Sequence, residues 1–327
     1  SLCYGLVAGS ILQFFVVFLV MRKKGYRYRL SVSYKDKKLR KAFALSAYPA
    51  LGNLATFGVQ VVQNFLCSFL SPGSLSALRY ATRIVDVFSA LFAGGIVTVI
   101  LPIASAQVAN NDVTGLGSTM RRGLKLLLMI TLPLSVWLLV MNKTLIAVAF
   151  ERMRFTASDT MIVGNIVMLM TPYIFLSRFL GLQEAPFFGS SEPKLPLMNN
   201  IVLAVLNILF SVIFYFPLGV YGVAISRSIS YAISAAFMAL LMIRRFGVFG
   251  FSQLRYDITK IFISTLIMAA ALVLVQAAIP VVDGTEFTWR LYAFLTPSAA
   301  GVLLFIVAII TLKLVDLSDI RKLLGRN

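Results

Sequence analysis

Three charged residues within one largely apolar stretch are the clearest chemical signal in this sequence. Arg79, Arg83 and Asp86 lie inside residues 75–106, where most of the other side chains are apolar. Spacings of four and three residues place all three on one face of a helix. A charge at the centre of a membrane costs about 2.5–3.5 kcal/mol on insertion scales, so this face should look into a helix bundle or a wet cavity.

The two arginines suggest an anion site. Arginine does not lose its proton in proteins, and its planar fork donates two hydrogen bonds to a phosphate oxygen pair. We therefore predict that Arg83, with Arg79 and the neighbouring Asp86, forms a substrate-binding face for phosphate or pyrophosphate. The alternative is a structural ion pair between Arg83 and Asp86, which lie about one helical turn apart.

Two more arginines lie within apolar segments. Arg178 is near the end of one segment, and Arg227 is flanked by Ser226 and Ser228 in another. Carboxylates in these segments are few, namely Asp86 and, at a segment end, Glu184, so the bundle carries excess positive charge. Arg178 could equally extend its head group to the membrane surface, whereas the serines beside Arg227 favour a polar environment inside the bundle.

The elements that must position these residues are membrane-spanning helices. Hydrophobic residues make up 59% of the 327 residues, above the roughly 45–50% of a soluble domain. A spanning helix needs roughly 20 apolar residues. The sequence predicts an all-α polytopic membrane protein with about nine transmembrane helices, at residues 2–20, 42–70, 75–106, 123–150, 160–182, 197–216, 220–243, 260–279 and 289–312.

The basic residues define an orientation. The net charge is +18, and lysine and arginine concentrate in alternate loops, above all in residues 21–41 and 244–257. By the positive-inside rule these loops are cytoplasmic, and the basic 21–41 loop should lie on anionic membrane lipids. Residues 143–159 should then lie outside. Because the charge follows topology, we do not expect nucleic acid as a partner.

Several kinds of chemistry are not indicated. The chain has no histidine and two cysteines, Cys3 and Cys67, which have no metal-binding spacing. No cluster of paired carboxylates, or of nucleophile and base, falls in one predicted cavity, so we expect neither an enzyme nor a cofactor or metal site. Because the chain begins at Ser1 inside an apolar run, we interpret it as part of a longer protein.

Four motifs in order carry a family resemblance. Residues 71–105, SPGSLSALRYATRIVDVFSALFAGGIVTVILPIAS, resemble a motif of the MurJ (MviN) lipid II flippases. Residues 150–156, FERMRFT, residues 187–196, FFGSSEPKLP, and residues 222–228, GVAISRS, are similar to further motifs of that family. The resemblance covers essentially the whole chain.

The resemblance implies a fold of the MOP (MATE-like) superfamily, with two helical lobes around a central cavity. It divides the chain into the last helix of the first lobe with a basic loop (1–41), the six-helix second lobe (42–243), an interfacial segment with two C-terminal helices (244–312), and a cytoplasmic tail (313–327). The first lobe would be missing.

The implied function is a flippase in the bacterial cytoplasmic (inner) membrane. It would move an undecaprenyl-pyrophosphate-linked cell-wall precursor, lipid II, outward by alternating access. Alternatives are a polysaccharide or drug exporter of the same superfamily, and a non-transporting membrane scaffold or pseudoflippase.

The chain departs from the family pattern at three positions. Thr82 and Gln63 stand where the family often has acidic residues, and Arg227 stands where it often has threonine. The alignment predicts a polar cluster in the second lobe, formed by Gln63, Asn207, Ser211 and Arg227. Some members are thought to hold a monovalent cation there; a guanidinium in place of a carboxylate argues against cation coupling in this chain.

Overall fold

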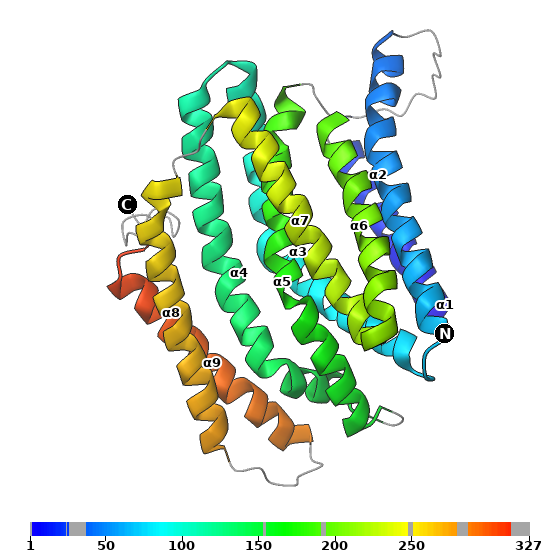
Figure 1. The fold of residues 1–327 in the computed structure, drawn as a ribbon, viewed down its shortest axis with the longest axis vertical. Coiled ribbons are helices and arrows are strands. Elements are labelled where there is room, and N and C mark those ends of the chain that lie inside the picture. The colour runs from blue at the N-terminus through cyan, green and yellow to red at the C-terminus, as the bar shows by residue number, and fades with distance from the viewer. Residues whose placement is uncertain are drawn as a thin grey trace. The chain divides into compact units, whose positions relative to one another are not determined.

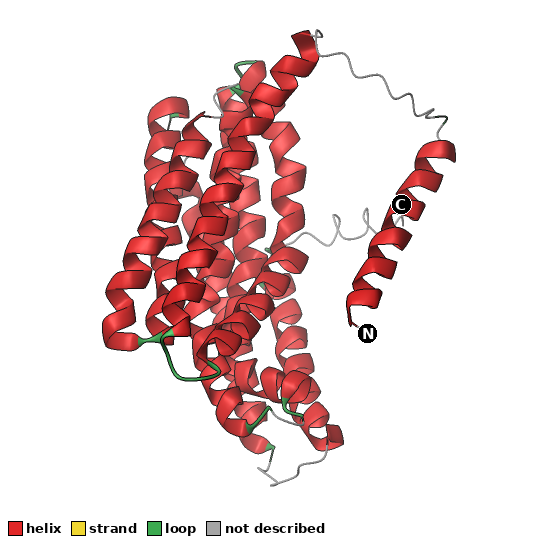
Figure 2. Ribbon diagram, turned by 90° about the vertical axis from the view of Figure 1, so that its right-hand side faces the viewer, coloured by secondary structure: helices red, strands yellow, loops and turns green. Residues whose placement is uncertain are grey.

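The computed structural model describes residues 2–23, 25, 37–152, 155–190, 194–247, 251–279 and 287–314. These ranges contain nine helices and no strand. Figures 1 and 2 draw the helices as coiled ribbons in two views. The helices are α1 (Leu2–Lys23), α2 (Lys37–Ser68), α3 (Ser74–Ala109), α4 (Val113–Phe150), α5 (Ala157–Gly189), α6 (Lys194–Leu218), α7 (Val220–Phe246), α8 (Phe251–Ala278) and α9 (Phe287–Thr311).

The chain forms two compact units, Ser1–Ser46 and Ala47–Asn327. The first contains α1 and the start of α2, and the second contains the remainder of α2 and α3–α9. Most of the basic loop predicted at 21–41 lies outside the described residues, and so does the tail beyond residue 314.

The all-helical prediction is confirmed, with the helices in the predicted order. Among the described residues, six helices (α4 to α9) are long and apolar enough to cross a membrane, and α3 makes a seventh if its two bent parts count as one span. These helices support a multi-pass membrane protein, while the exact number of nine spans stays a prediction.

The helices extend well beyond two pairs of predicted spans, so the loops between these spans are shorter than the sequence indicates. Between the predicted spans 75–106 and 123–150, α3 continues to Ala109 and α4 starts at Val113. Asp112 caps α4 by accepting a hydrogen bond from the Gly115 amide, and Asn111 adopts a left-handed conformation with φ 56°. The 184–196 loop is likewise mostly helical. Apolar runs mark the membrane-embedded part of a helix, whereas capping residues mark its ends.

Helix α3 is bent. Its two parts, Ser74–Phe92 and Gly94–Ala109, meet at 49°. Gly94 and Gly95 lie at the start of the second part, directly after the break. Glycine is a recognised cause of sharp helix kinks, because a residue without a Cβ allows a wider range of backbone angles. The bend separates the half that carries the charged residues from the half that ends at the α3–α4 turn.

Helix α5 lies at the centre of the second unit, packed against α3, α4 and α7. Its fully buried Ile166, Val167 and Ile174 meet Ala81 and Val85 of α3 in one core cluster. A Cβ added to Gly189 would lie 2.4 Å from the Ser105 Cα, so this glycine permits close packing of α5 on α3. Such small residues are typical of helix contacts in membranes.

The pair α8–α9 packs beside α4 (Figure 1). The Trp137 Nε1 donates to the Ser298 Oγ at 3.1 Å, and Lys125 pairs with Asp257 at 3.1 Å. The helices α8 and α9 therefore attach to the rest of the second unit through α4.

Candidate functional site

The charged face predicted on α3 lies on the surface of the second unit. Arg79 and Arg83 are exposed, while Leu78, Ala81 and Val85 between them are buried in the core. Neither guanidinium has an ion-pair partner among the described residues. The first half of α3 thus has an apolar face that packs in the core and a cationic face that remains accessible to a ligand.

Asp86 does not pair with Arg83. Its Oδ1 accepts a hydrogen bond from the Arg227 Nη2 at 2.8 Å, and the side chains are 41% and 18% exposed, respectively. The Arg227 guanidinium also lies 3.8 Å from the centre of the Tyr173 ring, a cation–π distance. Residues from α3, α5 and α7 therefore meet around one buried positive charge.

The polar cluster predicted in the second lobe is partly assembled. The Gln63 Nε2 donates to the Asn207 Oδ1 at 2.9 Å and to the Ser211 Oγ at 3.2 Å. The Ser211 and Ser226 hydroxyls lie 2.8 Å apart, so α2, α6 and α7 are joined. All four side chains are uncharged.

The structure does not bring Arg227 into this polar cluster. Ser226 occupies the position we expected for Arg227, and successive residues of a helix point about 100° apart. Ser226 therefore faces α6, whereas Arg227 faces Asp86 and Tyr173. Sequence reasoning missed Ser226, although the serine at that point of the 222–228 motif was a usable signal.

Arg178 points into the bundle beside the bend of α3. Its Nε donates to the Ser89 Oγ at 2.9 Å, and its Nη1 lies 4.0 Å from a Cβ position built on Gly94. Its guanidinium therefore contacts α3 instead of extending away from the helix bundle. Together with Arg79, Arg83 and Arg227, it gives the α3 side of the lobe more positive charge than Asp86 can balance.

The FERMRFT motif connects the end of α4 with α5 and α9. The Glu151 Oε1 accepts from the Arg290 Nη2 at 3.0 Å, and its Oε2 accepts from the Thr160 hydroxyl at 3.0 Å. Arg152 lies 5.1 Å from the centre of the Phe287 ring. These contacts are structural, because they hold three helix ends together.

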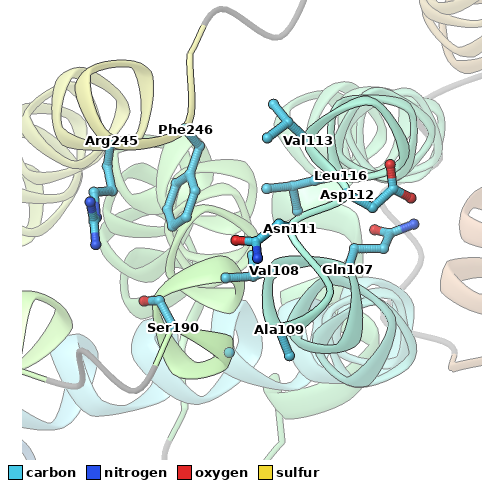
Figure 3. A pocket seen from close by; sticks show the side chains of 11 residues that line it. Gln107, Val108, Ala109, Asn111, Asp112, Val113, Leu116, Ser190, Arg245 and Phe246 are labelled. Carbon is cyan, nitrogen blue, oxygen red and sulfur yellow. The ribbon is translucent and has the colours of Figure 1, made fainter.

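A cavity of about 440 Å³ lies where α3 turns into α4, beside the ends of α5 and α7. Figure 3 shows Arg245 and Phe246 on one side of it and Val113 and Leu116 on the other. It is formed by the helix ends that the sequence had suggested were loops. It contains none of the predicted site residues.

Comparison with known proteins agrees with the sequence motifs. A family model described as "Lipid II flippase MurJ" matches residues 1–292. A protein of Vibrio cholerae named "Probable lipid II flippase MurJ" is 29% identical over 244 residues, covering 73% of this chain and 45% of the relative. A protein of the same name from Helicobacter pylori is 26% identical over 270 residues, covering 76% of this chain and 57% of the relative.

Solved structures agree on the fold. "Lipid II flippase MurJ, inward closed conformation" superposes with a TM-score of 0.67 at 24% identity, covering 92% of this chain and 59% of that chain. An outward-facing MATE family transporter of the MOP superfamily gives a TM-score of 0.55 at 18% identity, covering 81% of this chain and 63% of the other. This chain therefore spans about half to three-fifths of the length of these proteins.

Proposed function

This chain belongs to the MurJ family of lipid II flippases, and from that premise we propose that it supplies the second lobe of a transporter for lipid II. The family places it in the bacterial cytoplasmic membrane as a multi-pass protein, in agreement with the six candidate spans among the described residues. The substrate would be an undecaprenyl-pyrophosphate carrying the peptidoglycan building block. A first lobe outside this chain would complete the cavity, and transport would proceed by alternating access rather than by catalysis.

The observation that supports this proposal is the cationic face of α3. Arg79 and Arg83 are exposed and have no ion-pair partner among the described residues, so both retain their hydrogen-bond donors for a ligand. A pyrophosphate can accept a bidentate pair from a guanidinium. Arg83 would bind the pyrophosphate, and Arg79, one turn away, would add attraction.

Asp86 has a positioning role in this proposal. It is bound to Arg227 on α7 and so fixes the orientation of α3 about its axis. With Asp86 engaged by Arg227, no carboxylate on this face competes directly with the substrate for Arg83. The excess of positive charge then favours an anionic over a cationic substrate.

We also propose that this lobe does not use a monovalent cation at the Gln63–Asn207–Ser211–Ser226 cluster. The four side chains bond to one another and none carries a negative charge. Partners in this cluster come from α2, α6 and α7, so hydrogen bonds supply the cross-link that a bound ion could otherwise provide.

The test is complementation of a strain depleted of its own lipid II flippase, using the full-length protein. Arg83→Ala should abolish growth while membrane insertion stays normal, and Arg83→Lys should restore growth only in part, because the two-pronged geometry is lost. Arg255→Ala, which removes an exposed arginine of α8, is the matched control and should grow normally. Full growth of Arg83→Ala would reject the assignment.

A further inference from the structure

A glutamate lies inside the half of the lobe that is remote from the α3 arginines. Glu184 belongs to α5, and its Oε1 is buried with no hydrogen-bond partner among the described residues. The Asn199 side chain of α6 lies beside it. Asn199 is 0% exposed, and its Nδ2 also has no hydrogen-bond partner in the described part of the chain. A buried amide and a buried carboxyl group therefore lie side by side, within reach of a hydrogen bond between them.

Asn199 continues the contact to a third helix. Its Oδ1 accepts a hydrogen bond of 2.8 Å from the Ser234 hydroxyl of α7, and Ser234 is 0% exposed. The series Glu184, Asn199 and Ser234 thus links α5, α6 and α7. Since α6 packs mainly on α7 and touches α5 only slightly, this series is one of few connections between α5 and α6.

Among the residues that the structure describes, no cation forms an ion pair with Glu184. Helix α3 has no charged residue between Asp86 and its end. The cations on α5 and on the other elements packed near it are Arg121, Arg122, Lys125 and Lys143 on α4, Arg178 on α5, Lys194 on α6, and Arg227, Arg244 and Arg245 on α7. None of these cations lies within ion-pair distance of Glu184 in the described structure; Lys125, for example, pairs with Asp257. Tyr231 of α7 faces the Tyr173 ring instead.

We infer that Glu184 is a proton-binding site. Asn199 and Ser234 form a hydrogen-bond relay whose donors and acceptors change when Glu184 gains or loses a proton. An ionised carboxylate buried without a cation is costly, and binding a proton removes that cost. Ionisable groups within a membrane bundle are functional sites by default. The ligand is the proton alone, and the site is separate from the α3 arginines.

The relay has two arrangements that differ by one proton and one amide rotation. With Glu184 ionised, the Asn199 Nδ2 donates to the carboxylate, and the Ser234 hydroxyl donates to the Asn199 Oδ1. With Glu184 protonated, the Asn199 side-chain amide rotates by about 180°, and the Glu184 O–H donates to the Asn199 Oδ1. The Nδ2 then donates to the Ser234 Oγ. Proton uptake would therefore alter how α6 is held between α5 and α7.

Infrared difference spectroscopy on the full-length protein in lipid nanodiscs tests this inference. Titration from mildly acidic to alkaline buffer should remove a carbonyl band of a protonated carboxylic acid. The band should be absent in Glu184→Gln, whose amide imitates the neutral acid. Glu151→Gln is the matched control, because Glu151 is already paired with Arg290, and should retain the band.

A second variant separates the relay from a merely buried acid. Asn199→Leu should shift the carbonyl band of Glu184 to higher frequency, since the acid loses its hydrogen-bond acceptor, and it tests the relay even if Glu184→Gln folds poorly. A spectrum unchanged by either substitution would overturn the inference. A Glu184 carboxylate band that responds to sodium instead of pH would also overturn it, because Glu184 would then bind a metal cation. Neither readout requires lipid II transport.

Discussion

Removing either partner of the Asp86–Arg227 pair should destabilise the lobe to different degrees. The Arg227 side chain is 18% exposed and that of Asp86 is 41% exposed. Asp86→Ala leaves a mostly buried guanidinium beside the Tyr173 ring, without its carboxylate partner. Arg227→Met leaves a carboxylate that water can reach. We therefore expect the aspartate substitution to cost more.

The magnitude follows from the burial of each partner. Breaking a fully buried ion pair costs about 3–5 kcal/mol, whereas pairs at the surface contribute about 0–1 kcal/mol. With one partner half exposed, Asp86→Ala should cost about 2 kcal/mol of unfolding free energy. Arg227→Met should cost about 1 kcal/mol, because methionine keeps much of the packing and the remaining carboxylate is hydrated.

The measurement is reversible unfolding in mixed detergent micelles of the unmutated protein, both single variants and the double variant. Since the two residues touch, the double variant should be more stable than the sum of the single effects predicts, by about 1–2 kcal/mol. Ser76→Ala, at an exposed position of α3 outside this pair, is the control and should leave stability unchanged. An additive double variant, or a neutral Asp86→Ala, would refute the reasoning.

Three further predictions concern ions, orientation and pH. Replacing sodium by a bulky organic cation should leave flipping and thermal stability unchanged; a clear sodium-dependent stabilisation would contradict the neutral polar cluster. A cysteine at Ser158 should react with an impermeant reagent from outside intact cells and one at Ser33 should not; the reverse would invert the topology. The hydrogen bonds that Asp112 accepts from the Gly115 amide and the Thr114 hydroxyl lower its pKa. Asp112→Ala should therefore reduce stability at neutral pH, and the difference from the unmutated protein should fade in melting curves as pH falls through that lowered pKa; a constant difference would exclude the cap charge as the cause.

The helices and the α3 arginines could be predicted because their signals are local. Apolar runs of spanning length determine the helix order, and the spacing of Arg79, Arg83 and Asp86 determines their common face. The partner of Asp86 could not be predicted in the same way, because Arg227 is 141 residues away in the sequence. Two candidates within about two turns of the same helix, Arg79 and Arg83, were closer in sequence but are not its partners.

The polar cluster shows that an assignment of contact residues from sequence depends on the exact position along each helix. A shift of one residue on α7 exchanges Ser226 for Arg227, and with it a neutral hydroxyl for a charge. Glu184 and Asn199 could not be paired from the sequence either. They lie on different helices, and their contact depends on the angle at which α6 packs.

Because α3 is bent, a change in the angle at the bend moves the whole half that carries the charged residues. Arg83 lies ten residues from the break between Phe92 and Gly94, which corresponds to about 15 Å of helix at 1.5 Å per residue. A change of about 10° in the 49° angle would therefore move the Arg83 backbone by about 2.6 Å. Asp86 lies closer to the break and would move by about 1.8 Å, which is enough to lengthen its 2.8 Å bond with Arg227 beyond hydrogen-bond distance. A small change of angle at the bend would thus displace Arg79, Arg83 and Asp86 together relative to α7, with no helix having to unfold.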